Sequence, residues 1–197
     1  IVSASKDDDT IAWFENDGNA NPSFTKHVVA TSNNGPWAVH VADLDGDGDL
    51  DIVSASYIDD TIAWYENDGA ATWTPAFTAA DIATSADNAR SVFVADLDED
   101  GDLDIVSADR YNVTWHENDG AANPSWTSTN IATDLHYGYT VHVADLDGDG
   151  DLDIVSSSEA DDTIAWYEND GNANPSYTKN VVDTSADGAT SVYVADL

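Results

Sequence analysis

The sequence lacks cysteine and methionine and is nearly free of basic residues. Without cysteine, the chain can form no disulfide framework and no thiolate metal site. It carries 39 acidic residues against 5 Lys and Arg, which gives a formal net charge of −34. Nucleic acids and anionic membranes are therefore poor partners, because phosphate binding needs a basic footprint, whereas cations are natural partners. The absence of methionine, even at position 1, favours a processed product or a fragment.

Long apolar and helical segments are absent as well. No run of about 18 apolar residues is present, so we expect no membrane insertion, and no segment keeps a helical period. The chain is nevertheless no disordered acidic tail, since 42% of its 197 residues are hydrophobic. A chain of this length fits one domain that buries roughly 70% of its unfolded surface.

Internal repetition is the strongest pattern that the sequence contains. The segment VADL recurs at intervals of about 50 residues, the size of a four-stranded β-propeller blade. A TIAWYENDG-type segment and an NPSFTKHVVAT-type segment keep step with it. The repeats cover approximately residues 1–42, 43–95, 96–144 and 145–197. We therefore predict an all-β fold, a β-propeller with four repeats in this chain.

Each repeat predicts four short strands rich in β-branched and aromatic residues. Strand A ends in VADL, strand B is the IVSAS segment, strand C the TIAWYE segment and strand D the FTKHVVA-type segment. One tryptophan per strand C is expected to pack between blades rather than to stack on sugars: Trp13, Trp64, Trp115 and Trp166.

The chain starts on a strand B and ends on a strand A. The end blade is therefore either shared between the termini, with residues 190–196 pairing with residues 1–5, or completed by another chain. Self-association by exchange of these strands would give a closed dimer or a filament. We favour a fragment or a ring completed between chains over a lone four-bladed monomer.

The loop after each VADL is a candidate calcium site. From Asp43 onward, carboxylates fall at loop positions 1, 3, 5, 7 and 9, and Gly48 stands at position 6. Calcium takes six to eight hard oxygens, and glycine at position 6 permits the sharp bend that gathers them. Three copies in register with strands argue against simple polar turns. The predicted ligands are Asp43, Asp45, Asp47, Asp49, Asp51, Asp96, Asp98, Asp100, Asp102, Asp104, Asp145, Asp147, Asp149, Asp151 and Asp153.

These loops are no EF-hands, because an EF-hand needs Glu at position 12 and flanking helices. Position 12 is serine at Ser54, Ser107 and Ser156, so the bidentate role is expected to fall to the aspartate at position 9. The fourth loop retains Asp196 alone and should not bind calcium.

The motif Asp-x-Asp-x-Asp-Gly-x-x-Asp between two strands, once per repeat, resembles the FG-GAP/VCBS repeat of integrin α-subunits and of many secreted bacterial proteins. The Phe-Gly and Gly-Ala-Pro landmarks are missing, which favours the bacterial type. The resemblance implies a secreted or cell-surface propeller for adhesion, binding or assembly, in which Ca²⁺ fixes the A–B loops. It also implies that ligands bind the opposite face, made of the B–C and D–A loops.

The B–C and D–A loops carry cationic and aromatic side chains that could bind a glycan or a protein partner. The alternative is that these loops simply vary in sequence without a binding role, and that the aromatic rings cover the edges of the blades. The candidate ligand residues are Trp37, Tyr57, Arg90, Arg110, Tyr111, His136, Tyr137 and Tyr139, and Lys6 belongs to the same face.

Sequence motifs of common enzymes are absent, since there is no G-x-S-x-G, H-E-x-x-H or P-loop. We therefore predict a non-catalytic calcium-binding module. A lectin, or an accessory propeller of a polysaccharide-active enzyme, is the alternative function. Asn112 begins the one N-x-[ST] match, a weak signal for glycosylation.

Overall fold

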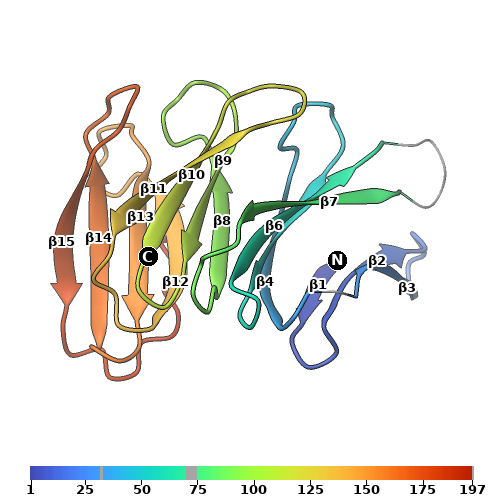
Figure 1. Cartoon of the computed structure of the whole chain (residues 1–197), viewed down its shortest axis with the longest axis horizontal. Coiled ribbons are helices and arrows are strands. Elements are labelled where there is room, and N and C mark those ends of the chain that lie inside the picture. Colours follow the sequence, from blue (N-terminus) through green and yellow to red (C-terminus); the bar gives the residue numbers. More distant parts are fainter. Residues whose placement is uncertain (32, 70–74, 197) are drawn as a thin grey trace.

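The computed structural model describes residues 1–31, 33–69 and 75–196 (Figure 1). These residues form fifteen strands, and none of them lies in a helix that is long and apolar enough to span a bilayer. The strands are β1 (Val2–Ser5), β2 (Thr10–Asn16), β3 (Phe24–Ala30), β4 (Pro36–Ala42), β5 (Asp51–Ser56), β6 (Thr61–Asn67), β7 (Phe77–Ala83), β8 (Ser91–Ala95), β9 (Asp104–Ala108), β10 (Val113–Asn118), β11 (Trp126–Ala132), β12 (Gly138–Ala144), β13 (Asp153–Ser158), β14 (Thr163–Asn169) and β15 (Tyr177–Asp183).

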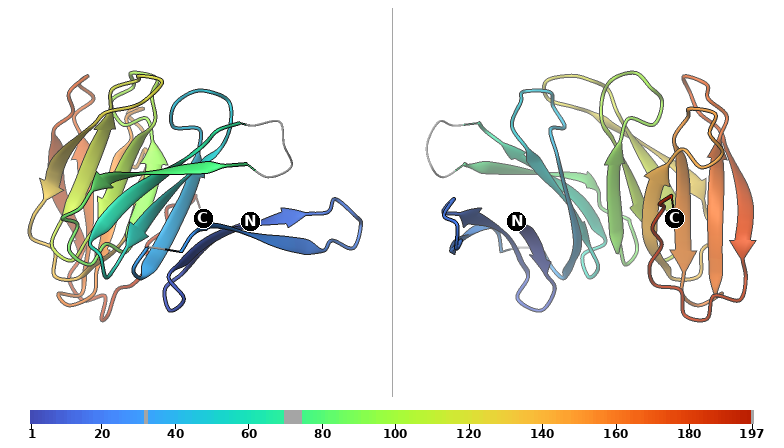
Figure 2. Two further views of the ribbon diagram at one scale, coloured as in Figure 1. Left: turned by 45° about the vertical axis from the view of Figure 1, so that its right-hand side comes forward. Right: turned by 180° about the vertical axis from the view of Figure 1, so that it is seen from behind.

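Each sheet consists of strands that are consecutive in the chain. The first sheet has the order β1-β2-β3, and three four-stranded sheets follow, β4–β7, β8–β11 and β12–β15. Figures 1 and 2 show the sheets standing one after another along an arc, from β1–β3 (blue) to β12–β15 (orange). The first strands β4, β8 and β12 lie next to each other. The predicted all-β architecture of repeated propeller blades is confirmed.

The middle strands are buried because neighbouring sheets cover both of their faces. Strands β5, β9 and β13 are buried along their whole length, whereas the outermost strands β7 and β11 are largely exposed. Trp64 and Trp115 belong to the two apolar clusters between the four-stranded sheets. Packing between blades is thus confirmed for these two tryptophans. Trp13 instead stacks on His27, with ring centroids 4.4 Å apart.

The C-terminal segment 190–196 lies against β12 and forms no sheet with β1. The Thr140 hydroxyl donates to the Thr190 carbonyl oxygen at 2.9 Å, and the ring of Tyr193 lies 4.5 Å from that of His142. Tyr193 thereby continues a row of inner-strand rings, His40, Phe93 and His142, whose centroids are 5.0 and 4.9 Å apart. Because these contacts hold the segment at its own end of the arc, the chain does not close the ring by itself.

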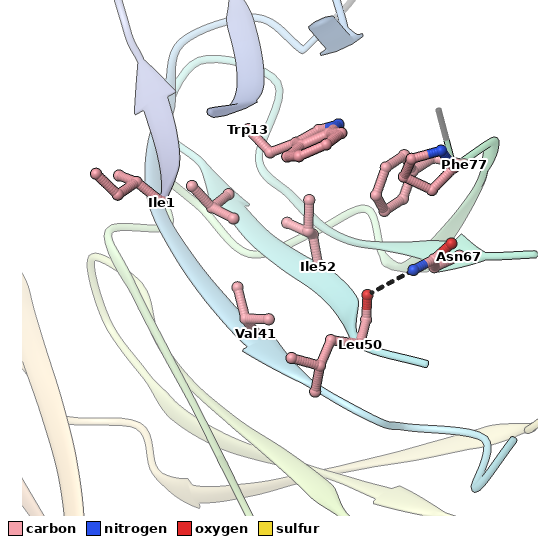
Figure 3. Close-up of a pocket in the computed structure, with 9 residues that line it drawn as sticks. Ile1, Trp13, Val41, Leu50, Ile52, Asn67 and Phe77 are labelled. Carbon is pink, nitrogen blue, oxygen red and sulfur yellow. Dashed lines mark hydrogen bonds between the residues drawn. The ribbon is translucent and has the colours of Figure 1, made fainter. Parts of the chain in front are cut away.

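An apolar pocket of about 410 Å³ opens between the first and second sheets. Figure 3 shows Ile1 and Trp13 facing Val41, Ile52 and Phe77 across it. In the next two seams, a leucine from the acidic loop that follows the first strand of the preceding sheet is buried, Leu44 in one and Leu97 in the other. The first sheet has no strand A among the described residues, so no such leucine fills the first seam.

His116 on β10 is a buried histidine between two serines. Its Nε2 lies 2.9 Å from the Ser107 hydroxyl, and its Nδ1 lies 2.8 Å from the Ser128 hydroxyl. Burial lowers the pKa of His116 to about 4. The corresponding residue of the last repeat is Tyr167, whose hydroxyl meets Ser156 at 3.2 Å. His116 is therefore a packing residue, and a polar cavity of about 150 Å³ beside it leaves room for a larger ring.

Replacing this histidine with the tyrosine of the last repeat, His116→Tyr, should remove an acid-sensitive contribution to stability. The folded-state pKa of His116 is depressed, so the unfolded state binds the proton first and stability is lost as the pH falls from about 6.5 toward 4. At pH 5 the loss is about 2 kcal/mol relative to pH 7.5. Urea unfolding at both pH values measures it, with the exposed His136→Gln as the control. Equal pH dependence in wild type and His116→Tyr would contradict this account.

Candidate metal loops and the opposite face

Each acidic loop joins the first two strands of a four-stranded sheet. In the loop between β4 and β5, carboxylate oxygens of Asp43, Asp45 and Asp47 lie within 4.8 Å of one another. Three converging oxygens could supply about half of the shell that calcium needs. The arrangement recurs in the β8–β9 and β12–β13 loops, with Asp96, Asp98 and Asp100 and with Asp145, Asp147 and Asp149. The structure thus brings together the residues predicted at positions 1, 3 and 5.

Glycine at the sixth loop position lets the chain turn back onto the first carboxylate. Gly48 has φ of +97°, a conformation that strains L side chains. Its N–H donates to the Asp43 carboxylate at 3.0 Å. Gly101 and Gly150 repeat the bond to the first aspartate of their own loops at 3.1 and 3.2 Å.

The aspartate at position 9 anchors each loop to the sheet. Asp51 is fully buried, and its carboxylate accepts the N–H of Leu44 at 3.1 Å and that of Asn67 at 2.8 Å. Asp104 and Asp153 make the same two bonds in their sheets. The bidentate metal role of this position stays a prediction, and the clusters of three converging carboxylates consist of positions 1, 3 and 5. Its backbone partners tie the loop to the end of the third strand.

Burial and mutual repulsion raise the pKa of several loop carboxyls. Burial raises the pKa of Asp104 to about 7. Loss of solvent raises the pKa of Asp98, and the charges of Asp100 and Asp96 raise it further. A cation among these groups would favour their ionised forms, because an opposite charge offsets both effects.

The aspartate at position 7 packs against the turn between the third and fourth strands. A Cβ on the glycine of this turn would overlap the aspartate carboxylate. The three pairs are Asp49 with Gly69, Asp102 with Gly120, and Asp151 with Gly171. The recurring ENDG turn is therefore fitted to the acidic loop beside it.

The other end of the sheets carries alternating cations and aromatic rings. Each strand A runs toward its acidic loop in an antiparallel sheet, so the loops before strand A and after strand B lie at the opposite end. Each cation there lies within 5.8 Å of at least two ring centroids. We call this set the cation–aromatic row; it consists of Lys6, Trp37, Tyr57, Arg90, Tyr139, Tyr137, Arg110 and Tyr111.

Arg90 stands at the centre of the row. Its guanidinium carbon lies 4.8 Å from the ring of Tyr139, 5.1 Å from Tyr57, 5.4 Å from Tyr137 and 5.8 Å from Trp37. The residue is only 7% exposed. Its Nε and Nη1 nevertheless have no hydrogen-bond partner within the described part of the chain.

Two hollows flank the row. One of about 340 Å³ is lined by Arg90, Tyr137, Glu159, Ala160, Asp187 and Gly188. The other, of about 580 Å³, is lined by Ser5, Lys6, Asp7, Asp8 and Trp37. The Glu159 carboxylate lies 4.0 Å from Nη1 of Arg90 and is partly exposed. Glu159 was not among the predicted ligand residues, although its place in a B–C loop was a usable signal.

Two further predicted residues lie outside the row. His136 is exposed, and its backbone N–H bonds the Ser158 hydroxyl at 3.0 Å. The Asn112 side-chain nitrogen donates to both carboxylate oxygens of Asp109, at 3.0 and 2.9 Å. Glycosylation of Asn112 stays a prediction.

Comparisons with known proteins agree with this repeat architecture. A family model described as an FG-GAP-like repeat matches residues 1–54, 43–107, 96–156 and 145–197. No curated protein matches the sequence. A solved lectin structure from Agrocybe aegerita, described as recognising non-reducing terminal N-acetylglucosamine, is similar with a TM-score of 0.58 at 20% identity. The similarity covers 92% of this chain and 48% of that one, so the chain spans about half of the lectin.

A pair of glycine substitutions should separate backbone strain from contact with the acidic loop. Gly120 and Gly18 occupy equivalent ENDG turns of two different repeats, with φ of +66° and +72°. Of these two glycines, only Gly120 faces a loop carboxylate. Gly18→Ala should cost about 1–2 kcal/mol through its left-handed backbone. Gly120→Ala should cost about 1 kcal/mol more, since it also displaces the carboxylate of Asp102.

Urea unfolding of both variants in calcium measures this difference. Equal losses would show that the turn and the acidic loop are not fitted to each other.

Proposed function

The chain belongs to the FG-GAP-like repeat family, and from this premise we propose that it is a calcium-loaded, non-catalytic propeller module that binds its partners outside the cell. The observation that carries the proposal is the recurrence of one carboxylate cluster in three loops. Each cluster has the same glycine turn and the same buried aspartate anchor. Oxygen donors of this kind favour a hard cation such as calcium over softer metals.

Calcium would act structurally in this role. Its charge would offset the repulsion between the loop carboxylates, and its coordination would fix the A–B loops. Affinities on the order of 10⁻⁴–10⁻³ M are typical of extracellular calcium modules. Such sites fill where calcium is abundant, which supports a secreted or cell-surface location.

A non-catalytic role is supported by the surroundings of the buried histidine. Ser107 and His116 are hydrogen-bonded, an arrangement that in hydrolases needs a third group to orient the base. Here the second ring nitrogen of His116 meets Ser128 rather than a carboxylate.

Thermal melting with calcium and with EDTA tests the calcium proposal. Three sites filled at about one hundred times their Kd should raise the melting temperature by roughly 15 °C or more. Asp98→Asn should remove about a third of this shift, because it weakens one loop of three, whereas the exposed Asp81→Asn should leave the shift unchanged. Identical melting temperatures with calcium and with EDTA would refute the structural role.

Glycan binding is a second candidate function, favoured by the cation–aromatic row. Aromatic rings with one free face can stack on sugar rings, and polar groups beside them can bond hydroxyls. The fold likeness to a lectin is consistent with this candidate.

Self-association is a further proposal, based on the open seam of the first sheet. The side-chain nitrogens of Asn118 and Asn169 donate to Leu44 and Leu97 of the preceding sheet at 2.9 and 3.1 Å. All three asparagines also donate to the leucine just before the second strand of their own sheet: Leu103, Leu152 and, for Asn67, Leu50. Among the described residues, Asn67 has no second bond to a preceding sheet, and it lies beside the apolar pocket (Figure 3).

We propose that segment 190–196 of a second copy completes this sheet. Light scattering should then give a mass of at least two chains, and a strictly monomeric mass at high concentration would count against it.

A further inference from the structure

We propose that the hollow beside Arg90 binds the carboxylate of an acidic sugar, with Tyr137 of the cation–aromatic row in its lining. The inference rests on the proposal that the propeller binds glycans and names the class of sugar. It starts from Arg90, a buried cation whose Nε and Nη1 have no hydrogen-bond partner in the described residues. Protein atoms enclose Nε and Nη1, but Arg90 also lines the hollow. A ligand that supplies a charged acceptor there would offset part of the cost of burying this cation.

The surroundings of the guanidinium decide which acceptor fits. Aromatic rings from two neighbouring sheets lie around it, Trp37 and Tyr57 from one and Tyr137 and Tyr139 from the other. The rings cannot bond the N–H groups of the guanidinium strongly, and these groups remain free. A carboxylate oxygen is the charged acceptor that a guanidinium N–H bonds most strongly.

Cationic side chains are concentrated on this face. Three of the five Lys and Arg residues of a chain with net charge −34 belong to the row: Lys6, Arg90 and Arg110. Acidic groups also line the hollows, namely Glu159 and Asp187 in one and Asp7 and Asp8 in the other. A free anion would be repelled by them, so the ligand must gain further contacts, which a sugar ring stacked on the aromatic side chains provides.

Glu159 is the internal competitor for the ligand. Its carboxylate lies 4.0 Å from Nη1 of Arg90, too far for a hydrogen bond but close enough for attraction. A ligand carboxylate that approached closer would meet the repulsion of Glu159. Removing the charge of Glu159 should therefore strengthen binding of an acidic sugar and leave binding of its neutral form unchanged.

Titration calorimetry with trigalacturonate in constant calcium tests the proposal. The matched ligand is the methyl ester of the same trisaccharide, which keeps the rings and masks the carboxylates. We expect the ester to bind about tenfold more weakly. Arg90→Gln should weaken trigalacturonate binding by about tenfold or more, and Glu159→Gln should strengthen it about threefold.

Controls separate this site from folding and from calcium binding. Glu159 is partly exposed, so Glu159→Gln keeps the test valid even where Arg90→Gln fails to fold. Asp161→Asn, a neighbouring substitution that lies outside both hollows, should change neither ligand's affinity. Melting curves in calcium identify any variant that has lost its fold.

Several outcomes would overturn the proposal. Equal affinity for the acid and its ester, or unchanged affinity in Glu159→Gln, would show that no carboxylate sits beside Arg90. Equal binding of triglutamate would show that the site takes acidic peptides rather than acidic sugars. If other sugars bind but trigalacturonate does not, the inference fails and the glycan proposal stands. If no sugar binds while calcium still raises the melting temperature, the glycan proposal fails as well.

Discussion

The repulsion between carboxylates in three tight loops is the constraint on which the rest of the structure depends. Three carboxylate oxygens converge within 4.8 Å in each loop, and like charges at such distances oppose the fold unless a cation joins them. The loops lie at one end of the sheets, next to the ENDG turns. A bound ion would hold the first, second and third strands of a blade in one arrangement.

The buried aspartate at position 9 transmits the state of the loop to the sheet. Asp104 bonds the backbone of Leu97 in the loop and of Asn118 at the end of the third strand. The side chain of Asn118 then reaches the carbonyl oxygen of Leu44 in the preceding sheet at 2.9 Å. A chain of hydrogen bonds thus connects each acidic loop to its own blade and to the neighbouring one. Ion binding is therefore expected to affect the packing between blades as well as the loop.

Much of this arrangement could be predicted from the sequence because repetition fixes the register. VADL and ENDG mark each blade, so the strands, the loops and the packing of Trp64 and Trp115 followed from pattern alone. The hydrogen-bond partners of Asp51 could not be predicted in this way. The spacing of the aspartates shows that a carboxylate is present, but not which backbone N–H groups donate to it. Arg90 was a predicted residue, but its position among rings from two other sheets depends on how successive sheets pack. Residues 190–196 pack against β12 through a ring contact between Tyr193 and His142. No sequence pattern predicts this contact.

We propose that the three acidic loops bind calcium and thereby support the blades. Native mass spectrometry counts the ions on each chain directly. We expect three calcium ions per chain at saturation, and two when Asp98 is replaced by asparagine under conditions that keep the other loops filled. A chain that remains folded and binds no calcium at millimolar concentration would contradict it.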